Sequence, residues 1–214
     1  MRKWTLPLAA AAGLATLSIG ALHAQGGPPQ LPGQMDPSRV QAGTYKSDKN
    51  HSLVGWRVNH FGFNDYFGIF GDVDATLTID PANPNGAKVD ATIPINPLVA
   101  SQGLHDHLLR DGTDGKKPDF FGSAQAPAHF VSTSVVATGN KATITGDFTL
   151  NGVTKPVTID AEFTGAGNSM MGNKLTLGFE GTAKIKRSDW GLGTFVPMVS
   201  DEVELTITTA FEKQ

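Results

Sequence analysis

The chain has 214 residues, with 17 Lys or Arg, 20 Asp or Glu and a formal net charge of −3 at pH 7. This balance disfavours nucleic acid and anionic membrane surfaces as partners, because both attract an excess of cations. The sequence contains no cysteine, which excludes disulfides, thiol catalysis, Cys-based metal sites and a lipoprotein anchor.

Residues 1–24 have the three parts of a secretory signal peptide. Arg2 and Lys3 are positively charged, Leu6–Leu22 is rich in Ala and Leu, and Ala24 is a small residue at a suitable cleavage point. No later segment approaches the ~20 apolar residues that span a bilayer. The sequence therefore predicts export to the periplasm or the cell exterior, with no stable membrane anchor.

Residues 25–42 are rich in Pro and Gly and poor in apolar side chains, most clearly in GGPPQLPGQMDP (26–37). Such a composition predicts an extended linker. One folded domain is expected over residues 43–214, which is long enough to bury a sizeable core.

From residue 43 on, apolar and polar residues alternate in short runs, as in strands that bury one face. Asn151-Gly152 lies between two runs and is a strong hairpin signal, because both residues tolerate a positive φ. Segment 96–110 instead has apolar residues at helical spacing, which predicts one short helix in a long loop. The sequence thus predicts strands near residues 54–60, 73–79, 89–95, 130–136, 144–150, 157–163, 175–185 and 203–211.

This pattern predicts an all-β, antiparallel fold, either a barrel or a sandwich. An eight-stranded barrel leaves room for one small ligand, whereas a sandwich has a filled core. Alternation is the same in both, so it does not separate them.

His60 ends a strand in which it shares a face with Val54, Trp56 and Val58. A buried polar ring without a partner costs a few kcal/mol. Two interpretations follow: a core histidine bonded to a backbone carbonyl, or a polar group in the wall of an apolar cavity. Under the second interpretation, Trp56 and His60 are candidate ligand contacts.

Two further runs contain candidate ligand-binding residues. In FGFNDYFGIF (61–70), the aromatics Phe61, Phe63 and Phe67 either fill one end of a barrel or line the route of an apolar chain. In RSDWGLG (187–193), Arg187 either pins a strand end through an ion pair with Asp189 or meets an anionic head group at a cavity mouth. Trp190 follows in the same run and is a candidate too.

Catalytic motifs are missing from the sequence. There is no G-x-S-x-G, no Gly-rich phosphate loop and no H-E-x-x-H, so we expect neither an enzyme nor a cofactor. His105 and His107, with His51, His60 and His129, are potential metal ligands. On a helix the first two rings point about 200° apart, so ordinary polar roles are favoured over a metal site.

The order of five motifs resembles the YceI-like family of secreted bacterial proteins, over essentially all of residues 43–214. The motifs are HS…HFG, DFF, GDFTLNGVTKPVT, RSDWGLG and SDEVELTI. The resemblance implies an extended, eight-stranded lipocalin-like barrel without catalysis, whose apolar tunnel holds a polyisoprenoid or similar lipid. It adds Phe120 and Phe121 to the candidate ligand contacts, and also marks His51, Ser52, His60, Phe130, Asp147, Gly152 and Arg187 to Gly191.

The chain departs from the family pattern in two places. DGTDGKKP (111–118) lengthens the loop before Phe120, and Gly122 replaces a usually acidic residue. We therefore predict a periplasmic or secreted carrier of a long-chain isoprenoid or related lipid, whose length or head group differs from the family's if the lengthened loop closes the tunnel. A fatty acid, fatty amide or quinone is the near alternative, and histidine-based metal binding is the distant one. The resemblance also makes a homodimer one of the oligomeric states left open by the sequence.

Overall fold

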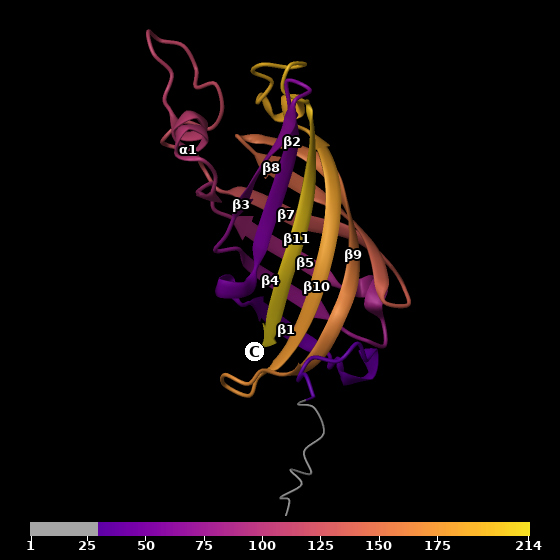
Figure 1. The fold of residues 1–214 in the computed structure, drawn as a ribbon. Helices are drawn as coiled ribbons and strands as arrows, with labels where there is room; N and C mark the ends of the chain where they lie inside the picture. The colour runs from indigo at the N-terminus through magenta and orange to yellow at the C-terminus, as the bar shows by residue number, and fades with distance from the viewer. Residues whose placement is uncertain (1–29) are drawn as a thin grey trace, which may run out of the picture. The chain divides into compact units, whose positions relative to one another are not determined.

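The structure, a computed structural model, describes residues 30–214. The described chain forms eleven strands, one α-helix and four short 3-10 helices (Figure 1). The strands are β1 (Gly43–Ser47), β2 (Leu53–His60), β3 (Asn64–Phe70), β4 (Asp74–Ile79), β5 (Lys88–Ile93), β6 (Pro97–Val99), β7 (Ala128–Thr138), β8 (Lys141–Leu150), β9 (Val153–Asn168), β10 (Leu175–Lys186) and β11 (Glu202–Lys213). The helices are α1 (Gln102–Leu109), η1 (Pro37–Arg39), η2 (Lys49–His51), η3 (Pro84–Gly86) and η4 (Arg187–Trp190).

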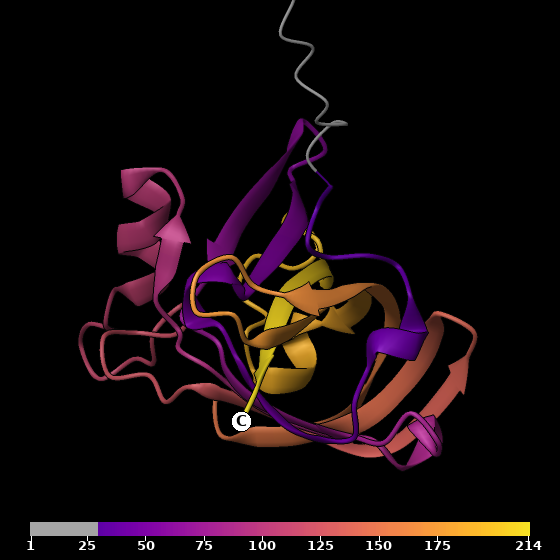
Figure 2. The ribbon, with the colours of Figure 1, turned by 90° about the horizontal axis from the view of Figure 1, so that it is seen from below.

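Eight of these strands form a closed antiparallel barrel, in the order β1-β4-β5-β7-β8-β9-β10-β11. The barrel closes where β11 pairs with β1, with Tyr45 opposite Lys213. Figure 2 shows α1 to one side of the strands. The predicted eight-stranded antiparallel barrel with one short helix is confirmed for the described residues.

Strand β11 has two successive partners along one edge. Its C-terminal end pairs with β1, whereas residues 204–208 pair with β2. Strands β3 and β6 then extend the sheet beyond β2. Between β1 and β2 the chain turns through η2 and the fully buried Ser52, whose hydroxyl lies 2.9 Å from that of Thr209. The sheet therefore closes into a ring along the C-terminal part of β11. Along the N-terminal part of β11 it carries an extension of three strands, β2, β3 and β6.

Two details of the prediction were wrong. The eight strands of the ring are not the eight predicted runs, because β2 belongs to the extension and the ring strand β1 was not predicted. The predicted helix over 96–110 is also shorter, since residues 97–99 form β6 and α1 begins after Ser101. Pro97 favours an extended residue before it, and the Ser101 hydroxyl caps the helix by accepting the Leu104 N–H at 3.3 Å.

Residues 31–39, in the predicted linker, pack against the barrel. Gln34 forms an antiparallel bridge with Ala166, with N–H to carbonyl distances of 3.0 and 2.8 Å. Gly167 permits this approach, because a Cβ there would lie 1.9 Å from the carbonyl oxygen of Pro32. This part of the linker is docked rather than free, and the predicted signal peptide lies outside the described residues. Within 30–214 no helix has the length and apolar character to cross a membrane.

Candidate functional site: an apolar barrel cavity

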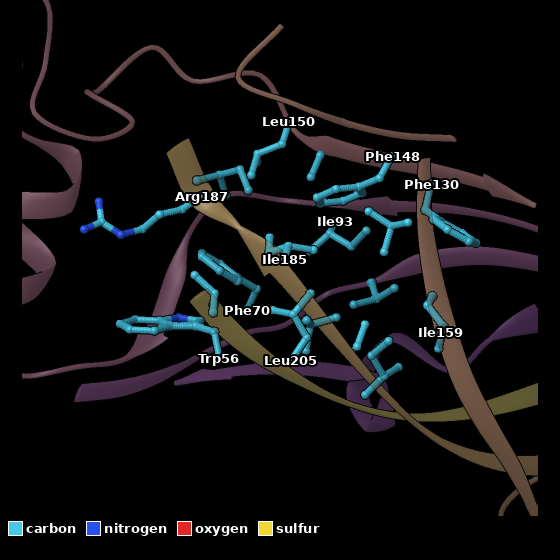
Figure 3. Close-up of a pocket in the computed structure, with 18 of the residues that line it drawn as sticks. Trp56, Phe70, Ile93, Phe130, Phe148, Leu150, Ile159, Ile185, Arg187 and Leu205 are labelled. Carbon is cyan, nitrogen blue, oxygen red and sulfur yellow. The ribbon is translucent and has the colours of Figure 1, made fainter. Parts of the chain in front are cut away.

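The barrel encloses a cavity of about 460 Å³. Its wall is built from the inward residues of seven ring strands and of β2 and β3, closed on one side by α1 and the segment that follows it. Aliphatic and aromatic side chains from different strands point into one interior (Figure 3). Small residues at inward positions, such as Ala75, Ala91, Gly181 and Ala183, leave the space that larger ones would fill. The volume is within the range typical of ligand pockets.

His60 lies in this wall, on the same face as Val54, Trp56 and Val58, as the alternation predicts. Its ring stacks on Tyr66, with centroids 4.2 Å apart and planes 14° from parallel. The His60 imidazole forms no hydrogen bond with any residue of the described chain. Within these residues, the interpretation of His60 as a core histidine bonded to a backbone carbonyl is therefore wrong. The indole Nε1 of Trp56 is buried and also has no hydrogen-bond partner in that part of the chain.

Arg187 is 6% exposed and anchors the loop between η4 and β11. Nε donates to the carbonyl of Ser200, Nη1 to the carbonyls of Leu192 and Thr194, and Nη2 to the carbonyl of Val199. The bonds to Ser200, Thr194 and Val199 are each 2.9 Å long. Burial lowers the pKa of the guanidinium from its ordinary value, and the charge of Asp201 opposes that shift.

The predicted alternative of an ion pair between Arg187 and Asp189 is wrong. Asp189 instead faces Lys155, with Nζ 3.5 Å from the carboxylate. The reason is the backbone: residues 187–190 form the turn η4 rather than the end of a strand, so the Arg187 side chain points inward while Asp189 stays at the surface. Four of the five N–H donors of Arg187 are engaged by the loop, and this makes the side chain primarily a loop anchor.

An aromatic cluster joins the α1 segment to that loop. The ring of His107 lies 5.2 Å from that of Phe120 and 5.9 Å from that of Phe195, between centroids. His107 Nε2 is 3.0 Å from Asp119, and the guanidinium carbon of Arg187 lies 5.9 Å from the Phe120 centroid. These contacts position one side of the cavity from two segments far apart in the sequence.

The structure brings six of the nine candidate ligand contacts to the cavity and places three elsewhere. Phe63 and Phe67 lie outside it and are 88% and 66% exposed. Trp190 is 2% exposed in the core, where its Nε1 donates to the Phe148 carbonyl at 3.3 Å. The six that line the cavity are Trp56, His60, Phe61, Phe120, Phe121 and Arg187.

Sequence reasoning missed three lining residues on the loop before β11, namely Leu192, Phe195 and Val199. This loop has no alternation that would distinguish inward from outward positions. The only available signal was the motif RSDWGLG, which contains Leu192 and precedes the other two residues.

The histidines do not gather around a common point. Across residues 30–214 no group of three or more His, Asp or Glu side chains is arranged to hold a metal ion. His105 lies 3.4 Å from Asp106, His107 is beside Asp119, and His129 is 2.8 Å from Asp90. These are separate pairings in which each ring has a different carboxylate.

A closed eight-stranded antiparallel barrel around an apolar cavity defines a lipocalin-like barrel. Comparison with known proteins gives the same class: the family model for the YceI-like domain matches residues 45–211. The chain therefore belongs to the YceI-like family.

Individual relatives agree with this assignment. Protein YceI of Salmonella arizonae is 41% identical over 170 residues, which is 78% of this chain and 85% of that protein. The crystal structure of Burkholderia cenocepacia BcnA is similar with a TM-score of 0.64 at 26% identity, over 77% of this chain and 98% of that one. A polyisoprenoid binding domain from Saccharophagus degradans shares the fold, with a TM-score of 0.54 at 12% identity, over 79% and 98% of the two chains.

Proposed function

We propose that this protein holds a polyisoprenoid, or a similar long-chain amphiphilic lipid, in the barrel cavity, and that it acts as a non-enzymatic carrier in the periplasm or outside the cell. The observation that carries the proposal is the cavity of about 460 Å³ with an almost wholly apolar wall. The barrel shared with a domain described as polyisoprenoid binding supports the choice of ligand class. The charged N-terminal region and apolar run of residues 1–24 support export.

In such a site the apolar tail decides affinity. Burying about 20 methylene-sized groups contributes roughly 16 kcal/mol gross, at ~0.8 kcal/mol each, and ordering the ligand removes a large part of this. One hydrogen bond to a charged group adds only ~1.5–3 kcal/mol. Because the Arg187 donors are largely engaged by loop carbonyls, the head group is oriented mainly by the polar parts of Trp56 and His60.

Native mass spectrometry tests the proposal directly. The protein is expressed from the full sequence, purified without detergent from the periplasmic fraction, and compared before and after organic extraction. We expect an added mass that belongs to an isoprenoid or fatty-chain series and moves into the solvent. If the protein stays empty even after incubation with octaprenyl and fatty-acyl lipids, it is not a lipid carrier. A bound mass of tens of daltons that a chelator removes would favour the metal alternative instead.

The absence of catalysis is part of the proposal and has its own test. The protein is incubated with lipid esters and amides, and free acid or alcohol is measured over many equivalents. We expect no turnover above that of heat-inactivated protein. Turnover that disappears when His60 is changed to Ala would contradict this part, while leaving lipid binding intact.

A further inference from the structure

Two loops meet at the end of the barrel that carries the β2–β3 extension. One is the turn 61–63 between β2 and β3, and the other is the loop 191–200 before β11; both lie at the top of Figure 1. The Phe61 N–H donates to the Met198 carbonyl at 2.7 Å, and the Ser200 N–H donates to the Asn59 carbonyl at 2.9 Å. These bonds hold the two loops together as one surface.

This surface, here called the rim, carries five exposed apolar side chains. A contiguous apolar patch on a soluble protein usually marks an interaction site. Aromatic side chains dominate the rim, which is typical of surfaces that enter a membrane interface. The exposed fractions are 88% for Phe63, 57% for Met198, 47% for Phe195, 46% for Phe61 and 38% for Val196.

The rim is continuous with the cavity. Phe61 and Phe195 are about half exposed and also line the cavity wall, so an apolar surface runs from the outside of the protein to its interior. Both residues have a positive φ, of 54° and 66°, which bulky side chains rarely adopt. The backbone is thus held in an unfavourable conformation at the two positions where rings stand at the opening.

Charge contributes little near the rim. Arg57 is paired with Asp65 and Glu204, and Lys155 is paired with Asp189. The neighbouring segment 110–119 contains three basic and three acidic residues. A partner that binds here is therefore recognised by apolar contact rather than by an excess of charge.

We propose that the rim docks onto a lipid bilayer, with Phe63 and Met198 inserted at the boundary of the acyl chains, so that lipid passes between membrane and cavity along the Phe61 and Phe195 rings. This inference rests on the proposed function for the identity of the cargo. A long apolar chain resists transfer through water in proportion to its area, and a continuous apolar path from bilayer to cavity removes that barrier.

Vesicle flotation tests the docking. The purified protein is mixed with neutral phosphatidylcholine vesicles and, separately, with vesicles that also contain anionic phosphatidylglycerol. We expect equal binding to both and little effect of salt. The double variant F63S/M198S should bind at least about tenfold more weakly, because two apolar side chains lose their burial.

A matched control is available at the other end of the barrel. Met170 and Met171, in the turn between β9 and β10, are 88% and 89% exposed. The variant M170S/M171S removes a similar apolar area far from the rim and should bind vesicles as the unchanged protein does. The single variants F63S and M198S, each with an intermediate effect, provide the same test if the double variant folds poorly.

Several results would overturn the docking: no vesicle binding by the unchanged protein, equal losses in the two double variants, or binding that requires anionic lipid and disappears in salt. A dimer that dissociates in F63S/M198S, without vesicle binding, would make the rim an interface between copies. Native mass spectrometry separates this inference from the proposed function. Vesicle binding by a protein that never takes up lipid would refute the carrier and leave the docking in place.

Discussion

Replacing Arg187 tests whether one buried guanidinium organises the cavity loop. In Arg187→Gln the amide can still donate two hydrogen bonds, so about two of the four loop carbonyls lose their donor. Each loss costs about 1–3 kcal/mol when the acceptor is buried. Removing the cation also relieves the desolvation that lowers its pKa, which offsets part of the cost. The two losses together cost about 2–6 kcal/mol before this offset, and we expect a net destabilisation of about 3 kcal/mol.

For a domain of this size, 1 kcal/mol corresponds to about 2–4 °C in melting temperature. Arg187→Gln should therefore melt roughly 6–12 °C lower in a calorimetric scan. Arg187→Lys keeps the charge but concentrates its three donors on one nitrogen, so it should be nearly as destabilised as the Gln variant.

Lys184 provides the matched control, because it is three residues away in the sequence and bridges Glu202 and Glu204 at the surface. Exposed ion pairs contribute about 1 kcal/mol or less, so Lys184→Gln should melt within a few degrees of the unchanged protein. The reasoning is refuted if Arg187→Gln melts no lower than this control. A fully stable Arg187→Lys would show that charge, and not the geometry of the guanidinium, holds the loop.

Variants at three further positions test the cavity, the surface charges and the hairpin. Ala183→Trp places an indole of ~150–250 Å² area in the cavity, and should reduce bound lipid severalfold in native mass spectra without lowering the melting temperature. The hydrogen bond from Arg57 holds the pKa of Glu204 below its ordinary value, so this stabilisation is present at neutral pH and lost as the pH falls through the lowered pKa. As the pH is lowered below about 4, the melting temperature of Glu204→Gln should therefore fall less steeply than that of the unchanged protein. Equal slopes of melting temperature against pH in the two proteins would contradict this. Asn151→Ala loses a 2.9 Å hydrogen bond to the Trp190 carbonyl and puts Ala at a φ of 50°. This should lower the free energy of unfolding, measured in urea, by about 1–3 kcal/mol. Asn151→Gly should recover the part of this loss that the positive φ causes.

The sequence alone was sufficient to predict which residues of a regular strand face inward. A period of two assigns every second residue to the same side wherever a strand is regular, and this placed Trp56 and His60 on the cavity wall correctly. The same rule applied to β3 separates Tyr66 and Phe70, which line the cavity, from Phe67, which lies between them and faces outward. The aromatic run was treated as one cluster, and for this reason Phe67 was grouped with the candidates.

Strand pairing was beyond the reach of alternation. Residues 43–47 and 53–60 are nearly continuous in sequence, yet β1 closes the ring and β2 starts the extension. What separates them is the turn η2 and the buried hydroxyl of Ser52 against Thr209. That contact joins residues 157 positions apart, and no local pattern in a single sequence encodes it.

The cavity itself could not be predicted from any single strand, because its volume depends on the sum of side chains that meet from all walls. Phe130 illustrates this. Its ring lies over Gly146 of the neighbouring strand, where an added Cβ would come within 2.5 Å of it, so a large residue and an absent side chain together define one part of the wall. By contrast, Ala91 and Ala183 are small residues of the cavity wall and leave space. The sizes were readable in the sequence, but which of them compensate each other depends on the register of the closed barrel. The family resemblance supplied that register, and this is why it predicted a tunnel where periodicity left barrel and sandwich equal.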